Sequence, residues 1–205
     1  MLRTIISSAI KTRLKYVLAF LFLQCFHFAQ QFNFQHYKVE DGLPQSTVFE
    51  LFQDKKGYLW IGTEGGGLCR YDGYRFKTYN STDGFYANLV RKVAQDKQGD
   101  LWVATNKGLY QIHEGKIRLV DEIKDNRSIY FMNVFVDQKG QIWAGSSGNG
   151  LFCIQRSSSG ALNVLSYNVD NGSFSNFIFD IEEDRNGNLW VASFGEGLMI
   201  IDKDK

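Results

Sequence analysis

The stretch Asp54-Lys55-Lys56-Gly57-Tyr58-Leu59-Trp60-Ile61-Gly62-Thr63 decides the fold, because it returns three more times along the chain. Each copy has an aspartate, a glycine three residues later, a Leu-Trp or Ile-Trp pair, an apolar residue, a small residue, and a threonine or serine. The copies begin at Asp54, Asp96, Asp137 and Asp184. All four tryptophans lie in these copies, at spacings of 42, 41 and 47 residues. Such a period indicates a repeat protein.

One repeat predicts four short antiparallel strands. The Asp-x-x-Gly phrase is typical of a tight turn, in which the aspartate binds backbone N–H groups and the glycine adopts a positive φ. A second turn leads to a Gly-Leu pair in each copy, at 67–68, 108–109, 150–151 and 197–198. A third turn, such as Asp72-Gly73, precedes an outer strand. Four strands in about 42 residues is the size of one β-propeller blade, and the 3.6-residue apolar spacing of helical repeats is not found.

We therefore predict an all-β chain of β-propeller blades. The blade units are expected at about 47–88, 89–131, 132–176 and 177–205. The pattern Phe34-x-x-Tyr37 with Asp41-Gly42 repeats the pattern Phe76-x-x-Tyr79 with Asp83-Gly84. Residues 34–39 are accordingly predicted as an outer strand that precedes the first unit, and in a closed ring this strand would complete the last blade.

Residues 1–30 are predicted to be a signal peptide. They carry four basic residues, no acid, and the apolar run Val17–Leu23, which is too short to span a bilayer comfortably. Cleavage is expected near Ala29 or Gln30. Two alternatives stay open: a lipoprotein with Cys25 as the lipidated residue, and a retained membrane anchor. Export is the interpretation that the pattern favours.

Composition and charge exclude several classes of protein. The 205 residues include 20 glycines and 15% aromatic residues, which argues against a disordered chain or a coiled coil. The formal net charge of +1 becomes −3 once the four basic residues of the first 30 are set aside. Residues 31–205 therefore give no electrostatic reason to expect a nucleic-acid partner.

Three stretches of the first repeat carry a resemblance to a known family. They are Asp-Gly-Leu-Pro-Gln-Ser at 41–46, Asp-Lys-Lys-Gly-Tyr-Leu-Trp-Ile-Gly-Thr at 54–63 and Glu-Gly-Gly-Gly-Leu-Cys-Arg-Tyr-Asp-Gly at 64–73. They resemble the two-component regulator propeller repeats of Bacteroidetes sensor proteins, and the resemblance covers about residues 33–205. It implies a periplasmic seven-bladed propeller, of which four copies would be an incomplete part.

The same resemblance implies a sensor role. In that family a β-sandwich, a membrane helix and a histidine kinase usually follow, and many members are thought to detect glycan fragments. None of those downstream segments is present, so no kinase residue is assigned here. Expected partners are a glycan or other small periplasmic ligand, together with downstream sensor kinase domains or a homodimer partner. Contact with a membrane is expected only through the missing downstream segments.

The sequence assigns no catalytic, metal or cofactor-binding residue, and it leaves the ligand-binding residues unknown. The tryptophans are interpreted as blade-core residues, and Gly62–Gly67 as a turn between strands. One aspartate per Asp-x-x-Gly turn is a weak calcium site. His36 and His113 are interpreted as surface residues. Tyr86 and Tyr130 could either contact a ligand or pack in the core or rim of the propeller, and the sequence does not decide between these roles. Cys69 and Cys153 are interpreted as unpaired buried residues.

Three functions compete at this point. The first is a periplasmic ligand-sensing propeller module, the N-terminal fragment of a two-component sensor, non-catalytic in itself and binding its ligand where inter-blade loops converge. The second is a self-contained secreted four-bladed propeller that acts as a binding or scaffold protein, latched by residues 34–39. The third is a propeller lyase or glycosidase, which would need a convergent acid/base or metal cluster.

Overall fold

The computed structural model describes residue 15, residues 33–172 and residues 175–202. The chain divides into two compact units, Met1–His36 and Tyr37–Lys205. The predicted signal peptide, at 1–30, lies outside the described residues apart from residue 15.

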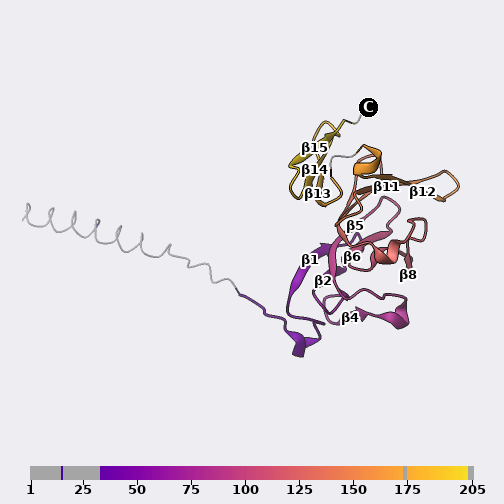
Figure 1. Cartoon of the computed structure of the whole chain (residues 1–205). Helices are drawn as coiled ribbons and strands as arrows, with labels where there is room; N and C mark the ends of the chain where they lie inside the picture. The colour runs from indigo at the N-terminus through magenta and orange to yellow at the C-terminus, as the bar shows by residue number, and fades with distance from the viewer. Residues whose placement is uncertain (1–14, 16–32, 173–174, 203–205) are drawn as a thin grey trace, which may run out of the picture. The chain divides into compact units, whose positions relative to one another are not determined.

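Four antiparallel sheets follow one another along the chain, coloured from indigo to yellow in Figure 1, and each is one blade. Blade 1 contains β1 (Val48–Gln53), β2 (Leu59–Thr63), β3 (Leu68–Tyr71) and β4 (Phe76–Tyr79). Blade 2 contains β5 (Val90–Gln95), β6 (Leu101–Thr105), β7 (Gly108–His113) and β8 (Lys116–Leu119). Blade 3 contains β9 (Phe131–Val136), β10 (Ile142–Ser146), β11 (Leu151–Arg156) and β12 (Leu162–Tyr167). Blade 4 contains β13 (Ile178–Glu183), β14 (Leu189–Ser193) and β15 (Leu198–Ile201). The predicted class, all-β propeller blades, is confirmed.

The blades pack on one another through their first strands. β1 contacts β5, β5 contacts β9, and β9 contacts β13. Isolated bridges join Glu64 to Leu89 and Ser147 to Phe177, across the boundaries between blades 1 and 2 and between blades 3 and 4. The buried core lies between neighbouring sheets, so that Trp60 and Leu68 of blade 1 share a cluster with Val93 of blade 2. One blade therefore buries its apolar face only against the next.

The Asp-x-x-Gly turns have the predicted geometry. Oδ1 of Asp54 accepts hydrogen bonds from the N–H groups of Lys56 and Tyr58, at 2.9 and 3.0 Å. Gly57 has φ of 86°, and the equivalent glycines of the other three turns are also in the left-handed region. The Asp carboxylate thus replaces backbone partners that a tight turn leaves unpaired.

The predicted outer strand at 34–39 is wrong. Residues 33–38 form no strand, and Val39–Asp41 form the short 3-10 helix η1. The repeated Asp-Gly motif encodes this turn, because Asp41 Oδ2 accepts from Lys38 N–H as Asp83 Oδ2 accepts from Asn80 N–H before η2 (Ser81–Asp83). A strand also needs a hydrogen-bonded neighbour, and no described strand pairs with residues 33–38.

Two further 3-10 helices, η3 (Asn126–Ser128) and η4 (Val169–Asn171), lie in the connections that follow blades 2 and 3. The sheets fall within the predicted blade units except at one point. β9 begins at Phe131, one residue before the expected boundary at 132.

Side chains on the outward faces of blades 1 and 4 are more exposed to solvent than the equivalent side chains of the other blades. Leu51 is 63% exposed, whereas its counterparts Val93, Val134 and Ile181 are buried. Trp190 is 37% exposed, whereas the other three tryptophans are buried. Both residues sit where a further sheet would pack, so the four blades are consistent with an incomplete propeller.

Candidate functional site

The meander topology gives the blades two different ends. One end, here called the turn face, carries the Asp-x-x-Gly turns at 54–57, 96–99, 137–140 and 184–187. The other end, here called the loop face, carries the turns between the second and third strands and the connections between blades. The loop face is where inter-blade loops converge, and it was the expected location of a ligand.

Every first strand contains a β-bulge beside the loop face. The register shifts between Val48 and Glu50, between Val90 and Lys92, and between Ile178 and Asp180. In blade 3, Phe131 and Asn133 oppose successive residues of β10, Ser146 and Gly145. The extra residue of each strand is therefore Phe49, Arg91, Met132 or Phe179. Bulges re-aim a side chain and are frequent next to functional sites.

The bulged residues Phe49, Arg91, Met132 and Phe179, here called the rim, combine three apolar side chains with one arginine. The Arg91 guanidinium lies 4.8 Å from the centre of the Phe49 ring, a cation–π contact between blades 1 and 2. The rings of Phe179 and Phe194 lie 6.0 Å apart. A cavity of about 240 Å³ opens between blades 3 and 4, lined by Met132, Ser147, Phe177, Ile178, Phe179 and Phe194. Exposed aromatic rings around a small cavity suit a ligand with an apolar face.

The next residue along each first strand is polar and connects neighbouring blades. The carboxylate of Glu50 lies 3.7 Å from Lys92 Nζ, and Asn133 Nδ2 donates to Asp180 Oδ1 at 2.6 Å. Burial raises the pKa of Glu50, and the charge of Lys92 opposes that effect only in part. Asn133 Oδ1 is buried without a hydrogen-bond partner among the described residues. A polar side chain thus follows each residue of the rim by one position in the sequence.

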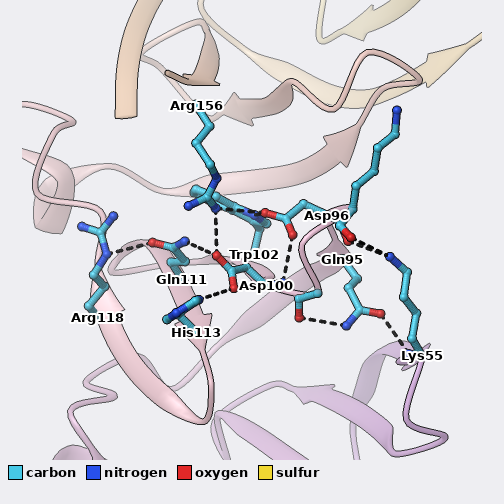
Figure 2. A network of polar contacts seen from close by, with 11 residues as sticks. Lys55, Gln95, Asp96, Asp100, Trp102, Gln111, His113, Arg118 and Arg156 are labelled. Carbon is cyan, nitrogen blue, oxygen red and sulfur yellow. Dashed lines mark hydrogen bonds and ion pairs between the residues drawn. The ribbon is translucent and has the colours of Figure 1, made fainter. Parts of the chain in front are cut away.

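The turn face is a continuous polar interface between blades, shown in Figure 2. Lys55 of blade 1 donates from its backbone N–H to Gln95 Oε1 at 2.9 Å and from Nζ to the Asp96 carbonyl at 3.0 Å. Arg156 of blade 3 reaches Asp96 Oδ2 at 3.1 Å and Asp100 Oδ2 at 2.8 Å in blade 2. These links cross the boundaries between blades 1 and 2 and between blades 2 and 3.

Asp100 is the centre of this interface. It is almost fully buried, and it accepts hydrogen bonds from Gln111 Nε2 at 2.6 Å and from Arg156. Burial acts to raise the pKa of Asp100, but the hydrogen bonds of His113, Gln111 and Arg156 outweigh it and hold the pKa below its ordinary value.

The structure places the residues singled out from the sequence as follows. His113 is exposed as expected, but its Nδ1 lies 2.6 Å from Asp100 Oδ1, a pairing that sequence spacing does not predict. Tyr86 is exposed on the loop between blades 1 and 2, under the guanidinium of Arg127 at 5.5 Å. Tyr130 is half-buried next to β9.

The cysteines and the turns between strands behave as interpreted. Cys69 and Cys153 are buried and unpaired, and burial raises the pKa of the Cys153 thiol to about 12. Gly62–Gly67 end β2 and turn toward β3. Within the described ranges, no group of three or more His, Cys, Asp or Glu side chains could hold a metal ion. Nor does that part of the chain contain a helix long and apolar enough to cross a membrane.

Comparison with known families gives the repeats a name. The model of the family described as two component regulator propeller matches residues 42–65, 87–107 and 172–195. The matched stretches of blades 1, 2 and 4 are similar to two-component regulator propeller repeats. The matched stretches cover the first strand, the Asp-x-x-Gly turn and the second strand of blades 1, 2 and 4.

Two solved extracellular domains share the fold. The extracellular domain of the proposed hybrid two-component system BT3049 from B. thetaiotaomicron is 23% identical, with a TM-score of 0.69 over 86% of this chain and 24% of that one. The extracellular domain of the proposed one-component system BT4673 from the same organism is 25% identical, with a TM-score of 0.65 over 82% of this chain and 26% of that one. The chain thus spans about a quarter of those domains.

The fold alone is shared with an enzyme. Virginiamycin B lyase from Staphylococcus aureus is 16% identical, with a TM-score of 0.52 over 78% of this chain and 57% of that one. No curated protein matches the chain. The two-component regulator propeller repeats therefore identify the architecture, and function has to come from the site.

Proposed function

We infer that these four blades belong to an exported, periplasmic ligand-sensing propeller of a two-component sensor, non-catalytic in itself. The observation that carries this proposal is the bulge in each first strand, which turns one residue per blade out of the regular ladder at the loop face. The repeat family and its likeness to extracellular sensor domains support it. A glycan or another small ligand with an apolar face suits Phe177, Phe179 and Phe194 around the cavity.

The proposed mechanism uses contacts between blades. A ligand that bridges Met132 and Phe179 touches blades 3 and 4 together, and the Asn133–Asp180 hydrogen bond lies one residue further along both strands. Binding would shift the packing between blades, and hence between the propeller and whatever domain follows. The size of any shift is limited by the difference in affinity between the two arrangements.

The competing functions rest on weaker observations. A closed four-bladed ring needs the latch strand at 34–39, and residues 33–38 form no strand. A lyase or glycosidase needs convergent acid, base or metal groups. Between blades 3 and 4 the loop-face cavity is lined by aromatic and aliphatic side chains and one serine.

The test is a ligand screen on the full chain. Oligosaccharides and other small molecules are screened by thermal shift, since a ligand that binds only the folded state raises its stability. Affinities of the hits are then measured by calorimetry for the wild type and for Phe179→Ala, with Tyr74→Ala as the matched control. Tyr74 is 93% exposed and lies on the turn between β3 and β4, away from the loop face.

We expect Phe179→Ala to weaken binding by about tenfold or more, as at aromatic side chains that a bound partner buries. Tyr74→Ala should bind as tightly as the wild type. If both variants bound every hit with the same affinity, the loop-face cavity would not be the binding site. Turnover of a hit by the wild type would replace the sensing role with the enzymatic one.

A further inference from the structure

A second cavity lies at the turn face between blades 1 and 2, at the opposite end of the blades from the rim. It has a volume of about 280 Å³, and its walls include the rings of Tyr58, Trp60 and Tyr79 together with the side chain of Arg70. Tyr79 stacks on Trp60 with the ring centres 5.4 Å apart, so this wall of the cavity is aromatic. This volume is just below that of most ligand pockets, roughly 300–1,000 Å³, so the cavity suits only a small molecule.

The side chain of Arg70 has no hydrogen-bonded partner among the described residues. Its guanidinium lies 4.2 Å from the centre of the Tyr58 ring, and its Nε is buried with no acceptor. An arginine presents its N–H groups as a planar fork that fits a carboxylate, and a buried donor without an acceptor costs free energy. The Nε–H of this cation is therefore a buried donor without an acceptor.

Comparison with blade 2 shows that Arg70 lacks a carboxylate partner. Arg70 lies opposite Trp60 in the sheet, as Gln111 lies opposite Trp102 in blade 2. In blade 2 the Gln111 amide donates to the carboxylate of Asp100, four residues after the turn aspartate. The equivalent residue in blade 1 is Tyr58, which has no carboxylate. Blade 1 thus keeps a donor at this position but has lost its acceptor.

The other charged groups of the cavity do not replace that acceptor. Asp54 Oδ2 already accepts from Trp60 Nε1 at 2.8 Å, and its Oδ1 accepts from two backbone N–H groups. Glu114 is exposed at the turn between β7 and β8, and no ion pair joins it to Arg70. Lys56 adds a second positive charge to the lining.

We propose that this cavity binds a small organic acid, with its carboxylate on Arg70 and its carbon skeleton against Tyr58, Trp60 and Tyr79. The acid supplies the carboxylate that Asp100 supplies in blade 2. As a ligand site of a sensing module it rests on the proposed function, but binding is measured on the protein alone. Loss of the rim site and loss of this site can therefore be told apart.

The test uses benzoate as the probe and benzamide as its neutral match in size and shape. Both are titrated into the ¹⁵N-labelled chain, and the Nε–H signal of Arg70 is followed by NMR. Benzoate should shift this signal saturably, and benzamide should leave it in place. Arg70→Gln, which copies the residue of blade 2, should weaken benzoate binding at least about tenfold. Arg185→Gln, an exposed change on blade 4, should leave it unaltered.

Three results would overturn the proposal. They are equal binding of benzoate and benzamide, undiminished benzoate binding by Arg70→Gln, and the absence of saturable binding tighter than roughly 10 mM. If Arg70→Gln does not fold, Arg70→Lys serves instead, because it keeps the charge and loses the planar fork. Severalfold weaker binding by Arg70→Lys supports the site, and wild-type affinity refutes it.

Discussion

The indole Nε1 of Trp60 donates a 2.8 Å hydrogen bond to Oδ2 of Asp54, six residues earlier in the chain. The same pairing recurs in the other blades, at 3.0, 3.0 and 3.1 Å. One carboxylate therefore closes the turn with Oδ1 and fixes the tryptophan of the next strand with Oδ2. The aspartate and the tryptophan of each repeat form one structural unit.

We expect Asp54→Asn to destabilise the fold by about 1.5–3 kcal/mol, the usual value of a hydrogen bond to a charged group. The Asn carbonyl can still accept from the turn, but its NH₂ group would then face the indole N–H. The free energy of unfolding is measured in urea for the wild type, Asp54→Asn, Trp60→Phe and the double variant. A coupling energy near zero in this cycle would show that the two residues act separately.

Arg156 holds blade 3 to blade 2 through two buried carboxylates. Arg156→Ala would leave Asp96 and Asp100 without their inter-blade cation, and breaking such a buried pair costs about 3–5 kcal/mol. The matched control is Lys77→Ala, which removes an exposed partner 3.9 Å from Asp83 and should cost less than about 1 kcal/mol. Equal losses for the two variants in urea unfolding would contradict the inter-blade role of Arg156.

The repeat, the strands and the turns could be predicted because local residue types encode them. The aspartate, the glycine and the tryptophan recur at fixed spacing, and each acts within about six residues of its partner. The strand at 34–39 was wrong because the similarity between Asp41-Gly42 and Asp83-Gly84 encodes a 3-10 turn. Whether a neighbouring segment becomes a strand depends on a partner that the sequence does not name.

The candidate sites were beyond prediction for a related reason. The bulged residues are two phenylalanines, an arginine and a methionine (Phe49, Phe179, Arg91 and Met132), so no single residue type marks the position. A bulge is visible only in the register of two paired strands. The Arg156–Asp100 contact joins residues 56 apart, across a blade boundary. One signal was present: aligning the four repeats shows an arginine at position 70 where the others have glutamine, cysteine and isoleucine.

Acid should weaken the link between blades 2 and 3. The pKa of Asp100 is lowered in the folded protein, so its contribution to stability is complete above the unfolded value, about 3.9, and is lost as the pH falls through the folded value. Asp100→Asn removes this titration. The difference in unfolding free energy between the wild type and Asp100→Asn should shrink as the pH falls from about 5 toward 2. A difference that stays constant over this range would show that Asp100 does not titrate with folding.

Gly145 should tolerate no side chain while Ile178 faces it. A Cβ on Gly145 would lie 2.5 Å from Ile178 Cγ2 and 2.9 Å from Ile178 Cβ, and Gly62 meets Val90 Cγ1 of blade 2 in the same way at 2.7 Å. Blade 2 has Ala104 at this position, and the residue that begins the next blade is Phe131, which is not branched at Cβ. A glycine in the second strand of one blade therefore goes with a β-branched residue at the start of the next blade, and an alanine goes with an unbranched one.

We expect Gly145→Ala to cost about 1–3 kcal/mol, the usual range for overpacking a core. Adding Ile178→Leu removes the branch at Cβ and should restore part of that stability, although Ile178→Leu alone should be neutral or destabilising. Unfolding in urea of the four proteins measures the coupling. If the double variant is no more stable than Gly145→Ala, the clash lies with the backbone of β13 and not with the Ile178 side chain.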